Sequence, residues 1–331
     1  MELFTIALLV ALATVLAAEF VNGWTDAPNV IATIVSTGVL SPRPAIAMAV
    51  IFNILRAMGG TPGAATVGSG IVVPSAMTLP AITASMLSII AWGSLAAKLG
   101  IPVSKSHALL AGLAGAGLAG GGWDALLWTG WQKVGIGLVC SLGLGFLGAL
   151  LIGKLVIRFA GSARPSPAKR TFNRLQLLSA AFMAYNHGLN DGQKFMGVFA
   201  LTMLAGGATD VFHIPFWVIL ICALTMGIGT SFGGGRIIET VGMKMARIAS
   251  WQGFAAQTSA SFTIFGASHF GIPLSTTHTI TTGIVGASAA KRTYDIRWGV
   301  MRRIVAAWAL TFPCCAVLAF VAALVANRLF P

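Results

Sequence analysis

Two short stretches of the sequence carry acidic and amide side chains beside glycine, inside otherwise apolar surroundings. The first is FVNGWTDAPN at 20–29 and the second is YNHGLNDGQK at 185–194. A constant offset aligns Asp26 of the first with Asp191 of the second. A charge at membrane depth is costly and is usually retained for a function. Two carboxylates at equivalent positions therefore predict one site built from both stretches.

A second pair of related stretches supplies hydroxyl groups. GIPVSKSHALL at 100–110 returns as GIPLSTTHTI at 271–280, and in each copy Ser or Thr residues follow Gly-Ile-Pro and open an apolar helical run. A helix start offers free backbone N–H groups and the positive end of the helix dipole, and these bind oxyanions. On one copy alone, Ser and Thr that only cap the helix would be the simpler interpretation. Two copies and two acidic stretches together favour a shared site for a tetrahedral oxyanion.

The composition is typical of a membrane protein with several spans. Of 331 residues, 56% are hydrophobic and 9% are charged, and the mean hydropathy is +0.87, whereas soluble domains carry about 25% charged residues. The net charge of +13 comes from basic residues that lie mostly between apolar runs, so membrane orientation explains it and nucleic-acid binding does not. The N-terminal segment lacks the basic start of a signal peptide and is expected to remain as a span. The four cysteines show no metal-binding or redox spacing.

Apolar segments define the expected elements, because a transmembrane helix needs about 20 apolar residues. The segments fall at 3–21, 44–60, 79–98, 102–120, 132–158, 175–190, 191–206, 213–231, 250–270, 273–290 and 300–327. The Gly-Ile-Pro at 100–102 leaves barely enough length on either side, which predicts a re-entrant hairpin or broken helices. We therefore expect an all-α polytopic membrane protein with broken helices and re-entrant helical hairpins.

The sequence contains an internal repeat that divides the chain into two related halves. Besides the acidic and the hydroxyl stretches, TVG at 66–68 returns in the same order as TVG at 240–242. The expected divisions are a first repeat at 1–157, a linker at 158–174 that is rich in Pro, Ser and Arg, and a second repeat at 175–331.

Charges in equivalent loops predict an inverted topology. The 57–80 stretch is uncharged whereas its counterpart at 231–250 is basic, and 290–303 is far more basic than its counterpart at 120–133. Under the positive-inside rule, equivalent loops then lie on opposite faces. This predicts two inverted-topology repeats, with the 158–174 linker in the cytoplasm and both termini outside. Inverted repeats around broken helices are typical of secondary transporters, whose site lies near the midplane.

These motifs resemble the inorganic phosphate transporter (PiT) family, especially its short bacterial members. The signature blocks of that family are similar to GWTDAPNVIAT at 23–33 and HGLNDGQKFMG at 187–197, and its helix starts are similar to PVSKSHA and PLSTTHT. Stretches at 227–242 and 297–313 extend the likeness over nearly the whole chain.

The resemblance implies that both repeats enclose one phosphate and that a cation gradient drives symport. It also implies a homodimer in the lipid bilayer, here the bacterial inner (plasma) membrane. The implied phosphate ligands are Asp26, Asn29, Ser104, Ser106, Asp191, Lys194, Ser275, Thr276 and Thr277. Lys105 joins this set because it offers further fixed positive charge.

Three positions depart from the family pattern. Thr25 stands where Asn or His usually precedes the first Asp, Pro28 replaces a small residue, and Lys105 replaces a hydroxyl residue. Lys194 lies opposite Asn29 in the repeat. Sodium sites need several neutral or anionic oxygens, so an ammonium group nearby weakens the case for sodium. The candidate cation-coupling residues are Asp26, Asp191, Asn190 and Thr25, and no metal or cofactor is assigned.

Charge balance favours protons as the coupling ion. Placing phosphate beside two ionised aspartates costs several kcal/mol. Fixed lysine charge offsets part of this cost but cannot dissipate a gradient, whereas burial beside an anion favours a protonated carboxyl group. The expected function is import of inorganic phosphate with protons by alternating access, as the free anion or as a metal–phosphate complex. Sodium coupling and another oxyanion, such as sulfate or arsenate, stay open as alternatives.

Two other classes of protein fit these residues less well. An intramembrane aspartyl protease is expected to show a GxGD motif, which residues 188–191 lack. A passive anion channel uses rings of like charge or a continuous pore lining, and two acidic residues would repel its anion. We therefore expect a transporter and not an enzyme. His107 and His278 occupy matched positions and His187 has no histidine counterpart, and none of the three is assigned a role.

Overall fold

The computed structural model describes residues 2–57, 62–162 and 164–329, and these residues are almost entirely helical. The α-helices in these ranges are α1 (Glu2–Ser36), α2 (Pro42–Ala57), α3 (Pro62–Ser69), α4 (Leu79–Lys98), α5 (Lys105–Gly121), α6 (Trp128–Ala160), α7 (Pro165–Ala205), α8 (Phe216–Ser231), α9 (Gly235–Glu239), α10 (Ser250–His269), α11 (Thr276–Ala289) and α12 (Trp298–Leu329). The shorter helical elements are η1 (Pro74–Ala76), η2 (Gly122–Ala125), the π-helical η3 (Thr240–Lys244) and η4 (Thr293–Asp295). The expected all-α fold is confirmed.

Several of these helices are suited to a lipid bilayer. Within the described ranges, four are long and apolar enough to cross a membrane, namely Thr5–Ser36, Leu79–Lys98, Trp128–Ala160 and Trp298–Leu329. The α8 helix and the Gly235–Lys244 segment form a further candidate, bent by 64° at the break between them. Large apolar side chains along α6 and α12, such as Leu147 and Val317, are exposed. Apolar residues on the outer face are typical of membrane helices.

Both acidic stretches lie inside continuous helices. The α1 helix passes through Asp26 and includes Pro28, and α7 runs unbroken for 41 residues. The sequence suggested separate apolar segments at 175–190 and 191–206, but the structure joins them, because the polar residues between them face protein neighbours and do not interrupt the helix. The 158–174 linker is also largely helical, since α6 ends and α7 begins within it.

The two Gly-Ile-Pro turns form the tips of helical hairpins. Gly100 (φ 68°) and Gly271 (φ 61°) take left-handed conformations, which glycine adopts without steric cost. Ser104 and Ser275 then cap α5 and α11, each accepting a hydrogen bond from the backbone N–H three residues further on. The α4–α5 and α10–α11 hairpins therefore share one construction.

Elements of each half pack against elements of the other half. The α5 helix packs against α12 and α11 packs against α6, while α2 and α3 pack against α7, and α8, α9 and η3 pack against α1. The isolated bridges Val72–Leu126 and Ala246–Ile296 are also equivalent. Each of the two large apolar clusters draws residues from both halves. The halves are therefore interleaved and do not form separate bodies.

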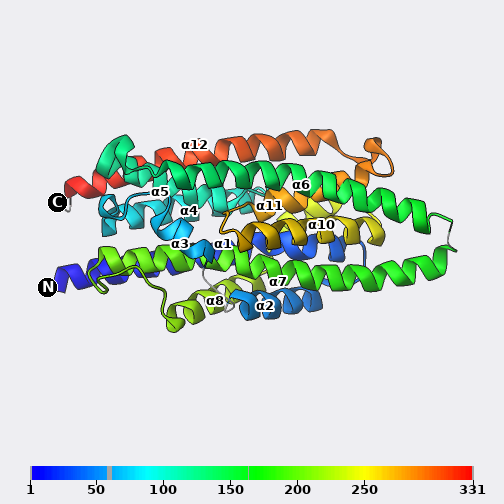
Figure 1. The fold of residues 1–331 in the computed structure, drawn as a ribbon, viewed down its shortest axis with the longest axis horizontal. Coiled ribbons are helices and arrows are strands. Elements are labelled where there is room, and N and C mark those ends of the chain that lie inside the picture. Colours follow the sequence, from blue (N-terminus) through cyan, green and yellow to red (C-terminus); the bar gives the residue numbers. More distant parts are fainter. Residues whose placement is uncertain (1, 58–61, 163, 330–331) are drawn as a thin grey trace.

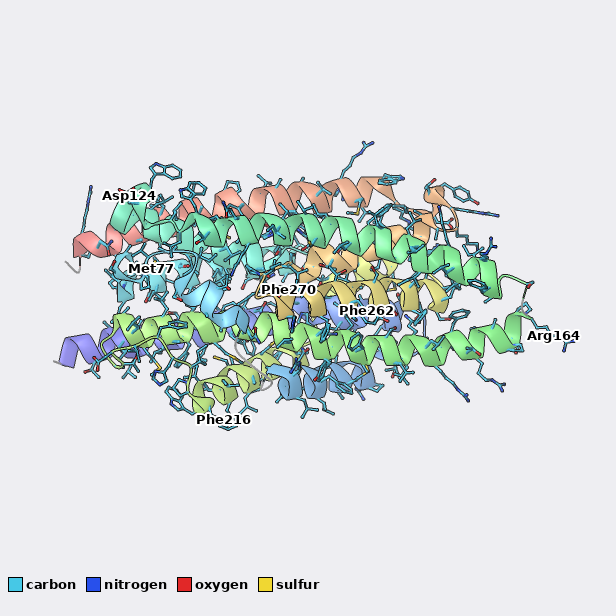
Figure 2. All side chains as sticks on the ribbon, viewed as in Figure 1. Met77, Asp124, Arg164, Phe216, Phe262 and Phe270 are labelled. Carbon is cyan, nitrogen blue, oxygen red and sulfur yellow. The ribbon has the colours of Figure 1, made fainter. Side chains whose placement is uncertain are left out.

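Equivalent helices run in opposite directions along the long axis (Figure 1). The α1 and α6 helices run away from the end that holds both termini, and α7 and α12 run back towards it. The α4–α5 hairpin enters from the end with the termini, and the α10–α11 hairpin enters from the opposite end. Figure 2 places Phe270, at the second tip, near the middle of the long axis, and Arg164 at the end opposite the termini. The two tips therefore meet in the middle of the molecule.

Candidate functional site

The middle of the molecule holds a dense group of buried polar side chains from α1 and α7. They are Glu19, Asn22, Thr25, Asp26 and Asn29 on α1, and Asn186, His187, Asn190, Asp191, Gln193 and Lys194 on α7, each at most 5% exposed. Residues three or four apart share one face of a helix, so each of these helices turns a polar face inward. Buried polar groups need hydrogen-bond partners, and many of these find them across the site.

The Asp191 carboxylate accepts hydrogen bonds from side chains of both α7 and α11. Its Oδ1 accepts hydrogen bonds from Lys194 Nζ at 2.6 Å and from Asn190 Nδ2 at 2.8 Å. Its Oδ2 accepts one from Thr276 Oγ1 at 3.1 Å. Charge-assisted hydrogen bonds are stronger than neutral ones. Since Thr276 begins α11, Asp191 ties the acidic stretch of α7 to the tip of the second hairpin.

Lys194 connects the two hairpin tips. Its ammonium group donates to Ser106 Oγ at 2.5 Å and to the carbonyl oxygen of Leu274 at 3.0 Å, in addition to its bond with Asp191. Ser106 Oγ also donates to the Leu274 carbonyl at 3.0 Å. Ser106 belongs to the first hairpin and Leu274 to the second, so one cation is shared by both halves of the chain.

Asp26 is paired more loosely, with Lys105 of the first hairpin. Lys105 Nζ lies 3.8 Å from Asp26 Oδ1, and the same ammonium group donates to the carbonyl oxygen of Val103 at 3.4 Å. Each of the two carboxylates therefore faces one lysine, and the formal charges of these two pairs sum to zero. A further anion would therefore add a negative charge that these two pairs do not balance.

Asn29 and Thr25 differ in what they contribute. Asn29 Nδ2 donates to Thr277 Oγ1 at 3.0 Å and approaches Thr276 Oγ1 at 3.5 Å, so α1 also reaches the second hairpin. The Thr25 hydroxyl instead donates to the carbonyl oxygen of Val21 in its own helix at 2.7 Å. The structure thus brings Asn29 to the hydroxyl cluster, whereas the hydroxyl hydrogen of Thr25 is used within α1.

The two cap serines lie at the hairpin tips, where they serve their own helices. The Ser104 and Ser275 side-chain oxygens accept the capping hydrogen bonds at 3.2 Å and 3.1 Å. The Ser275 N–H donates to Ser141 Oγ of α6 at 3.2 Å. Part of the backbone donor set that was expected to be free for an oxyanion is therefore satisfied within the protein. The hydroxyls of Ser106, Thr276 and Thr277 instead contact the polar groups of α1 and α7.

His187 joins the carboxylates although sequence reasoning did not assign it a role. Its Nε2 lies 3.1 Å from Asp191 Oδ2, which is within hydrogen-bonding distance, and its Nδ1 has no hydrogen-bond partner among the described residues. One ligand atom from each of Asp26, His187 and Asp191 lies within 4.8 Å of the other two. Carboxylate oxygens and neutral imidazole are common cation ligands. The available signal was spacing, because His187 and Asp191 are four residues apart and share a helix face.

The other two site histidines pack against each other. The rings of His107 and His278 lie 4.6 Å apart in a T-shaped arrangement, and the Trp308 ring lies 4.0 Å from that of His278. Trp308 Nε1 donates to the carbonyl oxygen of Pro102 at 3.0 Å. These histidines therefore belong to an aromatic cluster where both hairpins meet α12.

A third buried carboxyl group was missed by sequence reasoning. Glu19 is 0% exposed, and its Oε2 accepts a hydrogen bond from Asn22 Nδ2 at 3.2 Å. The residue had been counted only as part of the first apolar segment. An acidic residue within an apolar membrane run is itself a functional signal, and that signal could have identified it.

Comparison with known proteins gives an independent line of support. A family model described as "Phosphate transporter family" matches residues 22–319. Over 302 residues, the chain is 42% identical to a Rhizobium meliloti (strain 1021) protein named "Probable low-affinity inorganic phosphate transporter", covering 91% of this chain and 90% of that protein. A Bacillus subtilis (strain 168) protein of the same name is 35% identical over 333 residues, covering 100% of both.

The fold also matches a solved structure. A structure titled "The sodium-dependent phosphate transporter" has a TM-score of 0.82 and 21% sequence identity, covering 98% of this chain and 100% of that one. At this identity the likeness establishes the fold. The family and these relatives are transporters and not enzymes. This confirms the expectation of a transporter and not an enzyme, and it confirms the resemblance drawn from the motifs. The chain belongs to the phosphate transporter family.

Proposed function

We propose that this protein is a secondary active symporter that imports inorganic phosphate with protons across the bacterial plasma membrane by alternating access. The observation that carries the proposal is the meeting of both hairpin tips with two buried carboxylate–lysine pairs. Hydroxyl, amide and ammonium donors from several elements converge there, which is the donor set that recognises an oxyanion. Membership of the phosphate transporter family makes phosphate the preferred substrate.

The proposed ligands are the residues that the sequence singled out. They are Asp26, Asn29, Ser104, Lys105, Ser106, Asp191, Lys194, Ser275, Thr276 and Thr277. Several of these donors form hydrogen bonds with one another. Lys194 donates to Ser106, and Asn29 donates to Thr277. Phosphate entry would therefore exchange hydrogen bonds within the protein for hydrogen bonds to phosphate. The aspartates oppose entry, because two like unit charges 4 Å apart repel by about 4 kcal/mol at an effective dielectric constant of about 20.

A positive charge that enters with the anion would relieve this repulsion. The lysines remain in the site throughout the cycle and cannot dissipate a gradient. Asp26 is the better proton acceptor of the two aspartates, because its ammonium partner is 3.8 Å away, whereas Lys194 contacts Asp191 at 2.6 Å. Protonation of Asp26 would give the two carboxylate–lysine pairs one net positive charge, which balances a singly charged phosphate.

Sodium coupling is the second candidate function. The carboxylates and His187 place three ligand atoms within 4.8 Å of one another, and the Asn190 side-chain amide contacts Asp191 through its Nδ2. The solved structure of the same fold is titled as sodium-dependent. The same group of ligands also fits a divalent cation entering as a metal–phosphate complex. Lys105 and Lys194 already place positive charge beside these carboxylates, so the proton model accounts better for the site.

We further propose that the 158–174 linker faces the cytoplasm and that both termini lie outside. The termini share one end of the molecule and the linker lies at the other (Figure 1). The linker carries Arg158, Arg164, Lys169, Arg170 and Arg174, as the positive-inside rule favours. The opposed directions of equivalent helices support inverted repeats at 1–157 and 175–331. Assembly as a homodimer stays a prediction from the family resemblance.

Uptake of radiolabelled phosphate into proteoliposomes tests the proposed substrate. Unlabelled phosphate and arsenate, which share size and charge, should compete strongly, and sulfate should compete weakly. Asp191→Asn should abolish concentrative uptake, because it removes the negative charge that accepts hydrogen bonds from both Lys194 and Thr276. Competition by sulfate as strong as that by phosphate would instead favour a different oxyanion as the substrate.

A further inference from the structure

Glu19 is a buried acid that the proposed phosphate site does not use. It lies midway along α1 and is fully buried, and its Oε1 has no hydrogen-bond partner among the described residues. Its Oε2 has one, the Asn22 side chain at 3.2 Å. Burying a carboxylate without a cation costs several kcal/mol, and intramembrane acids are usually retained for a function. A carboxyl group in this position fits one that carries a proton during part of the transport cycle.

A polar stripe on α1 connects Glu19 to the site. Glu19, Asn22, Asp26 and Asn29 follow the helical spacing that keeps side chains on one face, and they are 0%, 1%, 2% and 2% exposed. The rise from Glu19 to Asp26 is about 10 Å along the helix axis. The stripe therefore extends about two turns beyond Asp26 towards the end that holds the N-terminus. It ends there, because the preceding residue on this face, Val15, is apolar and fully buried.

The surroundings of Glu19 set it apart from the two carboxylates of the site. The titratable and charged groups near it are Asp26 on its own helix, Asp191 and Lys194 on α7, and the Cys222 thiol on α8. Neither lysine forms an ion pair with Glu19, whereas each is paired with an aspartate. The offset that aligns Asp26 with Asp191 aligns Glu19 with Ala184. The acid is therefore a feature of the first half only, and the shared binding geometry does not require it.

We propose that Glu19 is a second proton-binding residue, which takes up the co-transported proton on the N-terminal side of the site and passes it to Asp26. The inference rests on the proposed proton coupling. In this step an O–H bond of the Glu19 carboxyl group breaks and one forms on the Asp26 carboxylate. Over about 10 Å the proton moves along a chain of water molecules, which must enter when the N-terminal side opens. No electrons are exchanged, and Glu19 returns to its carboxylate form.

Glu19→Gln tests this assignment because it keeps the volume and the acceptor for Asn22 but cannot bind a proton. The variant should retain most of its exchange of labelled for unlabelled phosphate at equal pH, since exchange moves no net protons. It should lose accumulation driven by an outside-acid pH gradient, and an entrapped pH dye should record fewer protons per phosphate than in the wild-type protein. Glu19→Asp, which restores a carboxyl group, should recover part of the accumulation.

Glu239→Gln is the matched control, because Glu239 is exposed and pairs with Lys244 away from the site. It should behave as wild type in both assays. Wild-type accumulation and proton uptake in Glu19→Gln would overturn the inference, and so would a parallel loss of exchange and accumulation, because a structural role affects both. If the wild-type protein itself ignores the pH gradient, the proposed proton coupling fails and the role of Glu19 fails with it.

Discussion

Replacing Asp191 by Asn should cost more stability than replacing Asp26 by Asn. The Lys194–Asp191 pair has a nitrogen–oxygen distance of 2.6 Å, and the Lys105–Asp26 pair one of 3.8 Å. At an effective dielectric constant of about 20, these distances correspond to Coulomb energies of about 6 and about 4 kcal/mol. Removing one member of a buried pair typically costs about 3–5 kcal/mol. We expect Asp191→Asn at the upper end of that range and Asp26→Asn lower by up to about 2 kcal/mol.

A double replacement separates stability from transport. Asp191→Asn with Lys194→Met removes both charges of the pair, and Met is apolar and of similar length. Because no buried charge is then left without a partner, the double variant should recover much of the stability that Asp191→Asn loses. It should still fail to transport phosphate, because an ammonium donor and a carboxylate are missing from the site. Thermal unfolding in detergent can be followed through the nine tryptophans, and transport through phosphate exchange in proteoliposomes.

Three results would contradict these expectations. Equal unfolding midpoints for the two single variants would mean that the shorter ion pair is not the stronger one. A double variant no more stable than Asp191→Asn would mean that the two charges are not energetically coupled. Phosphate exchange at the wild-type rate in the double variant would remove both residues from the transport mechanism.

Two further predictions concern topology and packing. In a background without the native cysteines, a cysteine at Ser166 should react with a membrane-impermeant label only from the cytoplasmic side. Cysteines at Gly121 and Lys291 should be labelled from opposite faces of the membrane. Labelling of both from one face would contradict the inverted repeat. Gly188→Ala should lower the unfolding midpoint by an amount equivalent to about 1–3 kcal/mol, because a Cβ there would collide with the backbone of α2. Gly143→Ala, where a Cβ meets open space, should leave the midpoint unchanged, and equal effects of the two alanines would argue against the close α2–α7 crossing.

It could be predicted from the sequence that the residues of the candidate site lie together, because the motifs occur twice. Asp26 and Asp191 were expected in one site with the hydroxyls of both hairpins, and the structure places these groups together. The particular contacts could not be predicted. That Lys194 would reach both Ser106 and the Leu274 carbonyl depends on how the two hairpin tips abut, and that placement arises from packing between halves that lie far apart in the sequence.

The features that the sequence analysis missed share one physical cause, which is that hydropathy averages over all faces of a helix. The polar residues of 185–194 divided α7 into two apolar segments, although in three dimensions they occupy the inward face of one continuous helix. Glu19 was hidden in an apolar average for the same reason. His187 was seen but left without a role, because its contact with Asp191 follows from the helix face and not from the repeat, in which Asn22 is its counterpart.

Proteoliposomes under imposed gradients test most directly whether a proton gradient drives phosphate accumulation by this protein. With equal pH on both sides, an inward sodium gradient should produce little accumulation of labelled phosphate. With sodium absent, an outside-acid pH gradient should drive phosphate well above its equilibrium level, and Asp26→Asn should abolish that accumulation. Strong accumulation under the sodium gradient, with none under the pH gradient, would contradict the account and make Asn190, Asp191 and His187 candidate sodium ligands.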